Sequence, residues 1–354
     1  MAIYSIWNNK GGVGKSYLTF QISCEYARNH PERNILVLDL CPQANASGML
    51  LGGIAEGERR LWELGMQNPP KTISGYIEDR IRNPYGSPKS GASYVVNVSE
   101  FNSHAPKNLY LVTGDEQLEI QSSRILNATT PGPTDAWRIV HTWISDMIED
   151  VKYSLNHDSL TVFIDCNPSF SIYTELAMSA SDRLIVPFSA DGSSKRAVRA
   201  VLALLYGITR RAGVQQSLFH LNSQRFRLSV PRIYCYVGNR LTQYVKSAIA
   251  FRTVVQEIGN EIWDVWQKNS EHFCIHPAGA SIPLEEASFR RMFQFESRDA
   301  NTASVVSSAL GIPIAALTAG KYEVVPGAER TSQVNQSQLD ELQPNTKDLV
   351  SMIE

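Results

Sequence analysis

Short apolar runs alternate with segments of helical periodicity along most of the chain. The run NILVLDL at residues 34–40 is apolar at almost every position up to Asp39, which is typical of a strand buried on both faces of a sheet. Residues 16–30 instead repeat apolar side chains at Leu18, Ile22 and Tyr26, the spacing of a helix, and end before Pro31. Apolar runs of the first kind occupy residues 2–7, 34–40, 109–114, 160–165, 182–189 and 231–240. This alternation predicts an α/β fold, a doubly wound, mainly parallel twisted sheet flanked by helices.

Three stretches shape the rest of the expected organisation. Residues 134–155 are predicted to form one amphipathic helix. Residues 52–108 are rich in Gly, Pro, Ser and Asn, and we interpret them as an elaborated insertion before the strand at 109–114. Residues 321–354 are polar and low in apolar residues, which predicts an extended or weakly helical C-terminal tail. We therefore expect one domain over residues 1–320 and a tail over 321–354.

Composition narrows the class of protein. With 354 residues, 43% of them hydrophobic, the chain can bury one large core or two modest ones. It has no run of the roughly 18 apolar residues that span a membrane, and its N-terminus does not resemble a signal peptide. The five cysteines are scattered and show no C-x-x-C spacing, so we expect buried thiols rather than disulfides or a zinc site. These features favour a cytoplasmic protein that does not bind a membrane.

The most informative stretch is NNKGGVGKSY, residues 8–17. Gly14, Lys15 and Ser16 supply the second half of the phosphate-binding pattern G-x-x-x-x-G-K-[ST], whereas Asn9 stands where the first glycine is expected. A predicted strand precedes the loop and a predicted helix follows it, so backbone N–H groups can converge on an anion. Lys15 is expected to pair with the β- and γ-phosphates and Ser16 to hold Mg²⁺. The predicted contacts to nucleotide are Gly11, Gly12, Val13, Gly14, Lys15 and Ser16. A chance glycine-rich turn is the alternative.

Two carboxylates end neighbouring apolar runs. Asp39 closes the run at 34–40, before the turn-rich segment CPQANAS, and Asp165 closes the run VFID. The carboxyl ends of parallel strands lie on the edge where such sheets bind ligands. We therefore expect both carboxylates near the phosphate loop.

Together, the stretches KGGVGKS, VLDLCPQANAS and VFIDCNPS resemble the ParA/MinD family of deviant Walker ATPases. The resemblance covers most of residues 1–320 and is closest to ParA-type partition ATPases without an N-terminal helix-turn-helix. It implies Mg-ATP bound between two identical subunits, with Lys10 reaching across the dimer to the partner's ATP. The same logic underlies an arginine finger. The alternative is that Lys10 is an ordinary solvated lysine. The polar C-terminus lacks the basic amphipathic helix of a membrane-bound relative.

The resemblance also assigns roles to single residues. Lys10, Lys15, Asp39 and Asp165 take the catalytic positions, and Ser16, Asp39 and Asp165 are the implied Mg²⁺ ligands. Asn239 takes the place of the family asparagine that reads adenine, although an ordinary asparagine at a strand end is the alternative.

Three positions depart from the family pattern. Cys41 replaces the second aspartate of switch I, which helps to position the attacking water, and a neutral thiol is a poor substitute. Tyr17, implied to lie against the nucleotide, replaces a threonine whose hydroxyl contacts the α-phosphate. Asn167 replaces a proline in the switch II turn. The sequence therefore predicts ATP binding with slow hydrolysis.

Basic residues are concentrated in one part of the chain. Residues 191–240 contain nine Lys or Arg and a single acid, Asp191, in a protein whose net charge is −2. Helical spacing from Ser194 places Arg196, Arg199, Tyr206 and Arg210 on one face. A basic face of this kind favours phosphate backbones. The candidate DNA contacts are Lys195, Arg196, Arg199, Arg210 and Arg211. The alternative is that these cations pair with acids from elsewhere in the fold.

Two functional hypotheses from different classes follow. The first is an ATP-dependent dimerisation switch of the ParA type that binds non-specific DNA, associates with the nucleoid and responds to a ParB-like or other adaptor. It would serve DNA segregation or the positioning of a cargo. The second is an ATP-sensing scaffold that barely hydrolyses ATP and regulates a protein complex without DNA. A metabolic phosphotransferase is the weakest alternative, because Lys10 would have little use in it.

Overall fold

A single mixed sheet organises the protein in the computed structural model, which describes residues 1–130, 132–155, 159–189, 191–210, 213, 215–241, 245–298, 300–324 and 331–354, without the side chains of 240–251. Eight of the described strands pair in the order β3-β4-β2-β5-β1-β6-β7-β8. All neighbours are parallel except β3 and β4, which confirms the predicted mainly parallel sheet. The strands are β1 (Ala2–Ile6), β2 (Asn34–Leu40), β3 (Val96–Asn97), β4 (Leu109–Val112), β5 (Leu160–Cys166), β6 (Arg183–Phe188), β7 (Arg232–Leu241) and β8 (Gln294–Arg298). Neither β3 nor β8 was predicted from the sequence.

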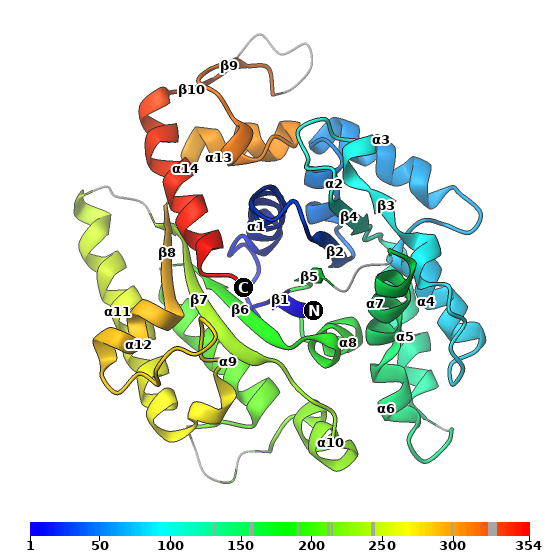
Figure 1. Cartoon of the computed structure of the whole chain (residues 1–354). Coiled ribbons are helices and arrows are strands. Elements are labelled where there is room, and N and C mark those ends of the chain that lie inside the picture. Colours follow the sequence, from blue (N-terminus) through cyan, green and yellow to red (C-terminus); the bar gives the residue numbers. More distant parts are fainter. Residues whose placement is uncertain are drawn as a thin grey trace.

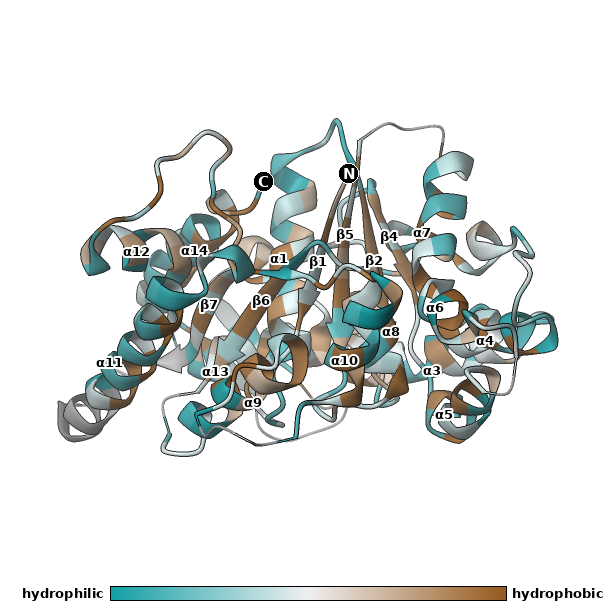
Figure 2. Ribbon diagram, turned by 90° about the horizontal axis from the view of Figure 1, so that it is seen from below, coloured by the Kyte–Doolittle hydropathy of each residue, from teal (hydrophilic) through white to brown (hydrophobic). Residues whose placement is uncertain are grey.

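Successive residues of the central strands enter different cores. Along β2, Leu36 and Leu38 belong to one buried cluster, whereas Ile35 and Val37 belong to the other. Side chains alternate between the two faces of a strand, so a run that is apolar at every position feeds both cores. Figure 2 shows this as brown strands between helices whose outer surfaces are teal.

Helices cover both faces of the sheet, as a doubly wound fold requires (Figure 1). The helices α1 (Lys15–Asn29), α13 (Asn301–Leu310) and α14 (Gln336–Ser351) lie on one face. The opposite face carries α7 (Trp143–Ser154), α8 (Ile172–Ala180) and α9 (Ser194–Tyr206), followed outward by α10 (Leu218–Phe226), α11 (Val245–Lys268) and α12 (Glu286–Phe293). The remaining helices are α2 (Asn45–Leu50), α3 (Ile54–Gly65), α4 (Ile73–Arg82), α5 (Gln117–Ala128) and α6 (Ala136–His141).

Two expectations about helices were wrong. The single helix predicted over 134–155 is two helices, because α6 ends at His141 and α7 begins at Trp143. The stripe of apolar residues continues through the break, so periodicity alone did not reveal it. Within α6, the Trp137 ring stacks on the His141 ring, with centroids 3.7 Å apart.

The C-terminal segment is not an extended tail. It forms a short hairpin of β9 (Gly320–Tyr322) and β10 (Ser332–Val334), and then α14. Leu339 and Leu342 of α14 join a small core with α13, while Leu349 and Val350 join the core beneath α1. These few leucines were enough to hold the helix because they share one face. The chain then returns to the sheet, where Tyr4 donates a 2.7 Å hydrogen bond to the Glu354 carbonyl.

The predicted insertion lies beside the carboxyl edge of the sheet. It contains α3, α4 and the edge strand β3. Gly57 of α3 lies directly against the Gly48 backbone of α2, where a Cβ would meet the carbonyl oxygen at 2.3 Å. This contact brings the beginning of α3 to the phosphate loop.

Two smaller expectations concern the whole chain. All five cysteines are buried thiols, as predicted. Among the described residues, no helix combines the length and the apolar character needed to cross a membrane.

Candidate nucleotide-binding site

The glycine loop between β1 and α1 has the backbone of a phosphate cradle. Gly12 and Gly14 adopt left-handed conformations, with φ of 74° and 82°, which residues other than glycine rarely adopt. A Cβ on Gly14 would collide with the Asn239 amide at 2.0 Å. Helix α1 begins directly after the loop, so the unpaired N–H groups of its first turn and its positive dipole end lie beside the cradle.

Lys15 points inward, across the loop. Its side chain is buried, and Nζ donates to the Lys10 carbonyl at 2.9 Å and the Asn8 carbonyl at 3.4 Å. Burial lowers the pKa of Lys15, and the nearby Asp165 carboxylate opposes that shift. An anion in the cradle would favour the charged ammonium, as expected for a lysine that pairs with phosphates.

Lys10 points the other way, out of its own cradle. Its Nζ contacts the Asp191 carboxylate, donates to Ser189 Oγ at 2.9 Å and lies 3.4 Å from Ser194 Oγ. The pair with Lys10 and the hydroxyls of Ser189 and Ser193 outweigh partial desolvation and lower the pKa of Asp191. The two lysines of the loop therefore have different surroundings, one among loop carbonyls and the other at the start of α9.

Asp39 and Asp165 lie side by side at the ends of β2 and β5, in register and fully buried. Asp39 accepts hydrogen bonds from the Cys41 N–H at 3.1 Å, the Ser47 N–H at 2.9 Å and the Ser47 hydroxyl at 2.7 Å. It therefore holds the turn at 41–47 against the sheet. Asp165 Oδ1 lies 3.4 Å from Thr19 Oγ1, while Oδ2 is buried without a hydrogen-bond partner among the described residues.

Burial and proximity make the charged forms of these two carboxylates unfavourable. Burial raises the pKa of Asp39 to about 6, against the hydrogen bonds from Ser47 and Cys41. Burial and the Asp39 charge raise the pKa of Asp165 to about 8, opposed by Ser16, Lys15 and Thr19. A divalent cation would remove this cost, since it favours the charged form of both groups.

The site therefore fits Mg²⁺, a cation that prefers oxygen ligands and keeps several waters. Asp165 offers a buried oxygen with unused acceptor capacity, and Ser16 lies next to it. Asp39 already orders the following turn, which suits a role in the outer shell of the ion. Mg²⁺ bound there would neutralise charge on the phosphates that it contacts.

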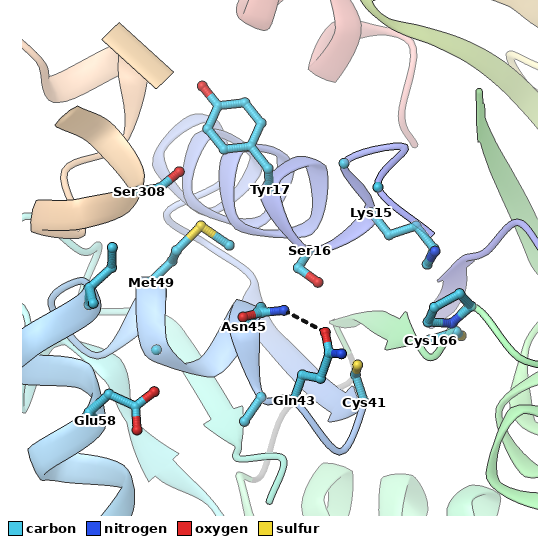
Figure 3. A pocket seen from close by; sticks show the side chains of 16 residues that line it. Lys15, Ser16, Tyr17, Cys41, Gln43, Asn45, Met49, Glu58, Cys166 and Ser308 are labelled. Atoms are coloured by element: carbon cyan, nitrogen blue, oxygen red, sulfur yellow. Dashed lines mark hydrogen bonds between the residues drawn. The ribbon is translucent and has the colours of Figure 1, made fainter. Parts of the chain in front are cut away.

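A cavity of about 520 Å³ opens along the loop (Figure 3), a volume within the usual range for a small-molecule site. Its lining residues are Gly12, Gly14, Lys15, Ser16, Tyr17, Cys41, Gln43, Ala44, Asn45, Gly48, Met49, Ile54, Glu58, Cys166, Pro168 and Ser308. Gln43 accepts a 3.1 Å hydrogen bond from Asn45 across the floor of the cavity (Figure 3). The cavity thus unites the predicted loop with the turns after β2 and β5.

Several of these residues were not predicted. Gln43 and Asn45 belong to the polar turn after Asp39, a signal that could have identified them. Glu58 and Ser308 carry no local signal, because α3 and α13 reach the cavity only through tertiary packing. Tyr17 lines the cavity, with its ring directed toward α13 (Figure 3), and its contact with the nucleotide stays a prediction.

Cys41 faces the cavity as a neutral thiol. It is 4% exposed, and burial together with the charges of Asp39 and Asp165 raises its pKa to about 12. A thiol in this state cannot accept a proton from water near neutral pH. Asn239, by contrast, lies behind the loop, where its Nδ2 donates to the Val13 carbonyl at 2.9 Å. Its reading of adenine stays a prediction.

Most cations of the predicted arginine face pair with acids of α11, although Arg210 stays 63% exposed. Arg199 donates to both Glu261 carboxylate oxygens at 2.7 Å, and Arg210 binds the same oxygens at 3.2 and 2.8 Å. Lys195 pairs with Glu257 at 2.9 Å. Tyr206, expected on the same exposed face, is buried and donates to the Pro231 carbonyl. Pairing with acids from elsewhere, the alternative interpretation, therefore holds for these three cations.

Two candidate DNA contacts remain. Arg196 is exposed and has no ion-pair partner within the ranges that the structure describes. Arg211 lies outside the described residues.

Burial would raise the pKa of Glu261, but Arg199 and Arg210 outweigh it and lower that pKa. The cluster therefore carries a fixed anion between two cations.

The fold and the loop define a P-loop nucleotide-binding protein with a second lysine in its phosphate loop. Residues 1–218 match the family AAA_31, described as an AAA domain. Because this match covers more than half of the chain, the protein belongs to that family, and its assignment to the ParA/MinD group of deviant Walker P-loop ATPases is confirmed. A curated relative from Pseudomonas putida, described as an uncharacterized protein in the gidB 3′ region, is 24% identical over 197 residues. This match spans 53% of the chain and 56% of the relative, about half of each.

Solved structures share the fold. A complex of a Cyanothece McdA variant with ATP aligns over 100% of the chain and 96% of its own, with a TM-score of 0.57 and 14% identity. The pnob8 ParA aligns over 84% of the chain and 81% of its own, with a TM-score of 0.51 and 15% identity. Protein DIP2308 from Corynebacterium diphtheriae aligns over 73% and 88%, with a TM-score of 0.51 and 18% identity. These similarities show the fold.

Proposed function

We propose that the protein is an ATP-driven dimerisation switch of the ParA type. The observation that carries the proposal is the division of labour between two lysines of one loop. Lys15 closes over the loop carbonyls, that of Lys10 included, whereas the Lys10 side chain turns away from its own cradle to Asp191 and is 23% exposed. We infer that a lysine facing away from the phosphates of its own subunit serves those of a second subunit.

In this proposal Mg-ATP occupies the cavity along the loop. Lys15 and the start of α1 hold the β- and γ-phosphates, and Ser16 and Asp165 hold the Mg²⁺. Asp39 and Asp165 lie at the strand ends that lead into the turns at 41–47 and 167–170. These turns can therefore respond to the presence of the γ-phosphate. The ATP complex of a McdA variant, which shares the fold, supports the choice of ATP.

Hydrolysis is proposed to be slow. The neutral Cys41 thiol stands where the family places a water-positioning carboxylate, and no acid takes its place in the cavity lining except Glu58, which comes from α3. A long-lived ATP dimer would suit a protein that holds a cargo in position until an adaptor protein triggers release. Segregation of DNA or positioning of a cargo is therefore the process that we propose.

Non-specific DNA binding is a further part of the proposal, in a narrower form than the sequence suggested. Arg196 is the exposed cation of α9, while Lys195, Arg199 and Arg210 are neutralised by α11. The ion pairs favour the second candidate, an ATP-sensing scaffold that controls a protein complex without DNA. The two candidates differ in whether the ATP dimer binds duplex DNA.

Dimerisation tests the central proposal. The mass of the protein in solution, measured by light scattering after size exclusion, should double with Mg-ATP and not with ADP. Lys10→Ala should bind ATP with nearly unchanged affinity and stay monomeric. Lys107→Ala, which removes an exposed lysine far along the chain, is the matched control and should dimerise like the parent.

Two results would reject the proposal. A Lys10→Ala variant that dimerises like the parent would show that Lys10 does not act across the dimer. A parent that remains monomeric with Mg-ATP, while binding it, would favour a monomeric nucleotide sensor.

A further inference from the structure

Helix α10 has two unlike faces. Its buried face carries Phe219 and Phe226, which pack against Trp137 with ring centroids 6.1 and 5.5 Å away. Its outer face exposes Leu218 by 71% and Leu221 by 40%, and Arg225 follows on the same side. The Ser217 hydroxyl caps the helix by accepting a 3.1 Å hydrogen bond from the His220 N–H. The leucines are therefore displayed by an ordered helix at the rim of the molecule (Figure 1).

Arginines without an ion pair lie at the C-terminal end of the helix that carries these leucines. Residues 192–256 contain eleven Lys or Arg and no Asp or Glu. On α9, Lys195 and Arg199 pair with Glu257 and Glu261 of α11. Arg225 and Arg227, at the end of α10, are exposed and form no ion pair with any residue that the structure describes. Two exposed leucines, followed at the C-terminal end of the helix by two arginines without an ion pair, thus form the patch.

The buried face of α10 reaches the nucleotide site through aromatic rings. Phe219 contacts Phe170 edge to face, with centroids 5.5 Å apart, and Phe170 packs on Trp7 at 5.2 Å. The Trp7 indole N–H donates a 2.9 Å hydrogen bond to the Asn167 carbonyl. Phe170 and Asn167 bound the turn that follows Asp165, and Trp7 directly precedes the phosphate loop. A displacement of α10 would therefore press on this turn.

We propose that α10 is the docking site for an acidic amphipathic segment of a partner protein, and that docking changes ATP turnover through Phe219 and Phe170. The apolar side of such a segment would cover Leu218 and Leu221, and its carboxylates would pair with Arg225 and Arg227. The second part rests on the proposed ATPase function, whereas the docking itself does not.

The chemistry of the patch favours a protein segment over other polyanions. A DNA backbone would satisfy the arginines and leave the two leucines in water. An anionic membrane would suit both features, but the nine-residue α10 offers only two exposed leucines to insert, a small apolar face for interfacial binding. An acidic amphipathic helix would present apolar side chains to the leucines and carboxylates to the arginines, at the spacing of one helix face.

The docking is tested by selection from a displayed library of random helical 15-residue peptides, with the nucleotide-free full-length protein immobilised. We expect enrichment of sequences that combine Leu or Phe at helical spacing with Asp or Glu. The best selected peptide should bind at least tenfold more weakly to the double variant Arg225→Glu, Arg227→Glu. Arg291→Glu, at an exposed position of α12, is the matched control and should leave binding unchanged.

The outcomes separate the possible occupants. Selected peptides without acidic residues, or equal binding to the parent and the double variant, would overturn the proposal. Binding to phosphatidylglycerol vesicles or to a 30-base-pair duplex would also overturn the proposal under two conditions. The binding must be lost in the double variant, and the selected peptide must fail to compete with it. Thermal melting of each variant confirms that it is folded.

The coupling is tested by phosphate release at saturating Mg-ATP, with and without the selected peptide. We expect the peptide to change the rate at least threefold in the parent. Phe219→Leu should retain peptide binding and lose this response, whereas Phe226→Leu, on the same buried face but without contact to Phe170, should keep it. Equal responses in both variants would overturn the coupling. Peptide binding in a protein that hydrolyses no ATP would uphold the docking and reject the proposed ATPase function.

Discussion

The phosphate loop and the arginine face of α9 were both predicted from residue types in a short window, yet only one kept its predicted surroundings. In the loop, the residues that decide the geometry are contiguous, and the two carboxylates come from strand ends that the sheet must bring together. On α9, the decisive partner of Arg199 is Glu261, 62 residues further along the chain. A charge pattern gives the chemistry of one side of a contact, and the other side depends on tertiary packing.

The difference also concerns energy. Lys15 and Asp165 are buried, and burial shifts both pKa values against the charged forms. A nucleotide and Mg²⁺ would stabilise those charged forms. Arg199 and Glu261 already satisfy each other, because the guanidinium donates two parallel charge-assisted hydrogen bonds to the two carboxylate oxygens. A site that awaits a ligand and a site that is internally complete can therefore be told apart by their unsatisfied groups.

Replacing Cys41 is expected to produce the largest effect, at the loop. Cys41→Asp restores a carboxylate beside the cavity and should raise ATP turnover by about 10²- to 10⁴-fold, the usual contribution of a positioned general base. ATP affinity should change little. Steady-state phosphate release at saturating Mg-ATP measures the effect, with Cys41→Ser as the control of equal size and no charge. An equally fast parent or serine variant would show that another group positions the water.

Removing the Glu261 charge should have a smaller effect, on stability. Glu261→Gln is expected to lose about 1–3 kcal/mol at pH 7, because both arginines lose a buried charged partner. Since the arginines lower the pKa of Glu261 below its ordinary 4.5, this stability is present above that pH and is lost as the pH falls through the folded-state pKa. Urea denaturation of parent and variant should therefore differ at pH 7 and converge as the pH falls below the folded-state pKa of Glu261.

The more exposed Glu257 provides the control for that experiment. Its carboxylate pairs with Lys195 but is 51% exposed, against 10% for Glu261. Glu257→Gln should cost at most about 1 kcal/mol. Equal losses in the two variants would mean that the Glu261 cluster is no more than a surface ion pair, and that its arginines remain available to DNA.

The smallest expected effect concerns DNA. If the ATP dimer binds duplex DNA, Arg196→Ala should weaken binding to all sequences and reduce the slope of log affinity against log salt concentration by about one. Lys107→Ala should change neither. Binding measured by fluorescence anisotropy at several salt concentrations gives both quantities. The absence of DNA binding at every salt concentration would reject this part of the proposed function and favour the scaffold.

These contrasts also show how much of the structure could be predicted from the sequence. The strands at 2–7, 34–40 and 160–165 were predictable because each feeds two cores and so must be apolar throughout. The packing of the C-terminal helix was missed because Leu339 and Leu349 are spread thinly through a polar segment and gain partners only in contact with α13 and α1. Ser308 and Glu58 were missed for the same reason. Residues were predictable when their neighbours in space were also neighbours in the chain or in the sheet register.

The place of β1 has a consequence for how the protein is made. The first strand of the chain is central in the sheet, and its partners are β5 and β6, with Ala2 opposite Thr161 and Tyr4 opposite Arg183. At a synthesis rate of about 5–20 residues per second, the strand waits roughly 10–40 s for these partners to emerge. The Tyr4 hydrogen bond to Glu354 then comes later still. During translation the apolar strand ahead of the phosphate loop is therefore exposed, and we expect it to be a point at which chaperones engage the nascent chain.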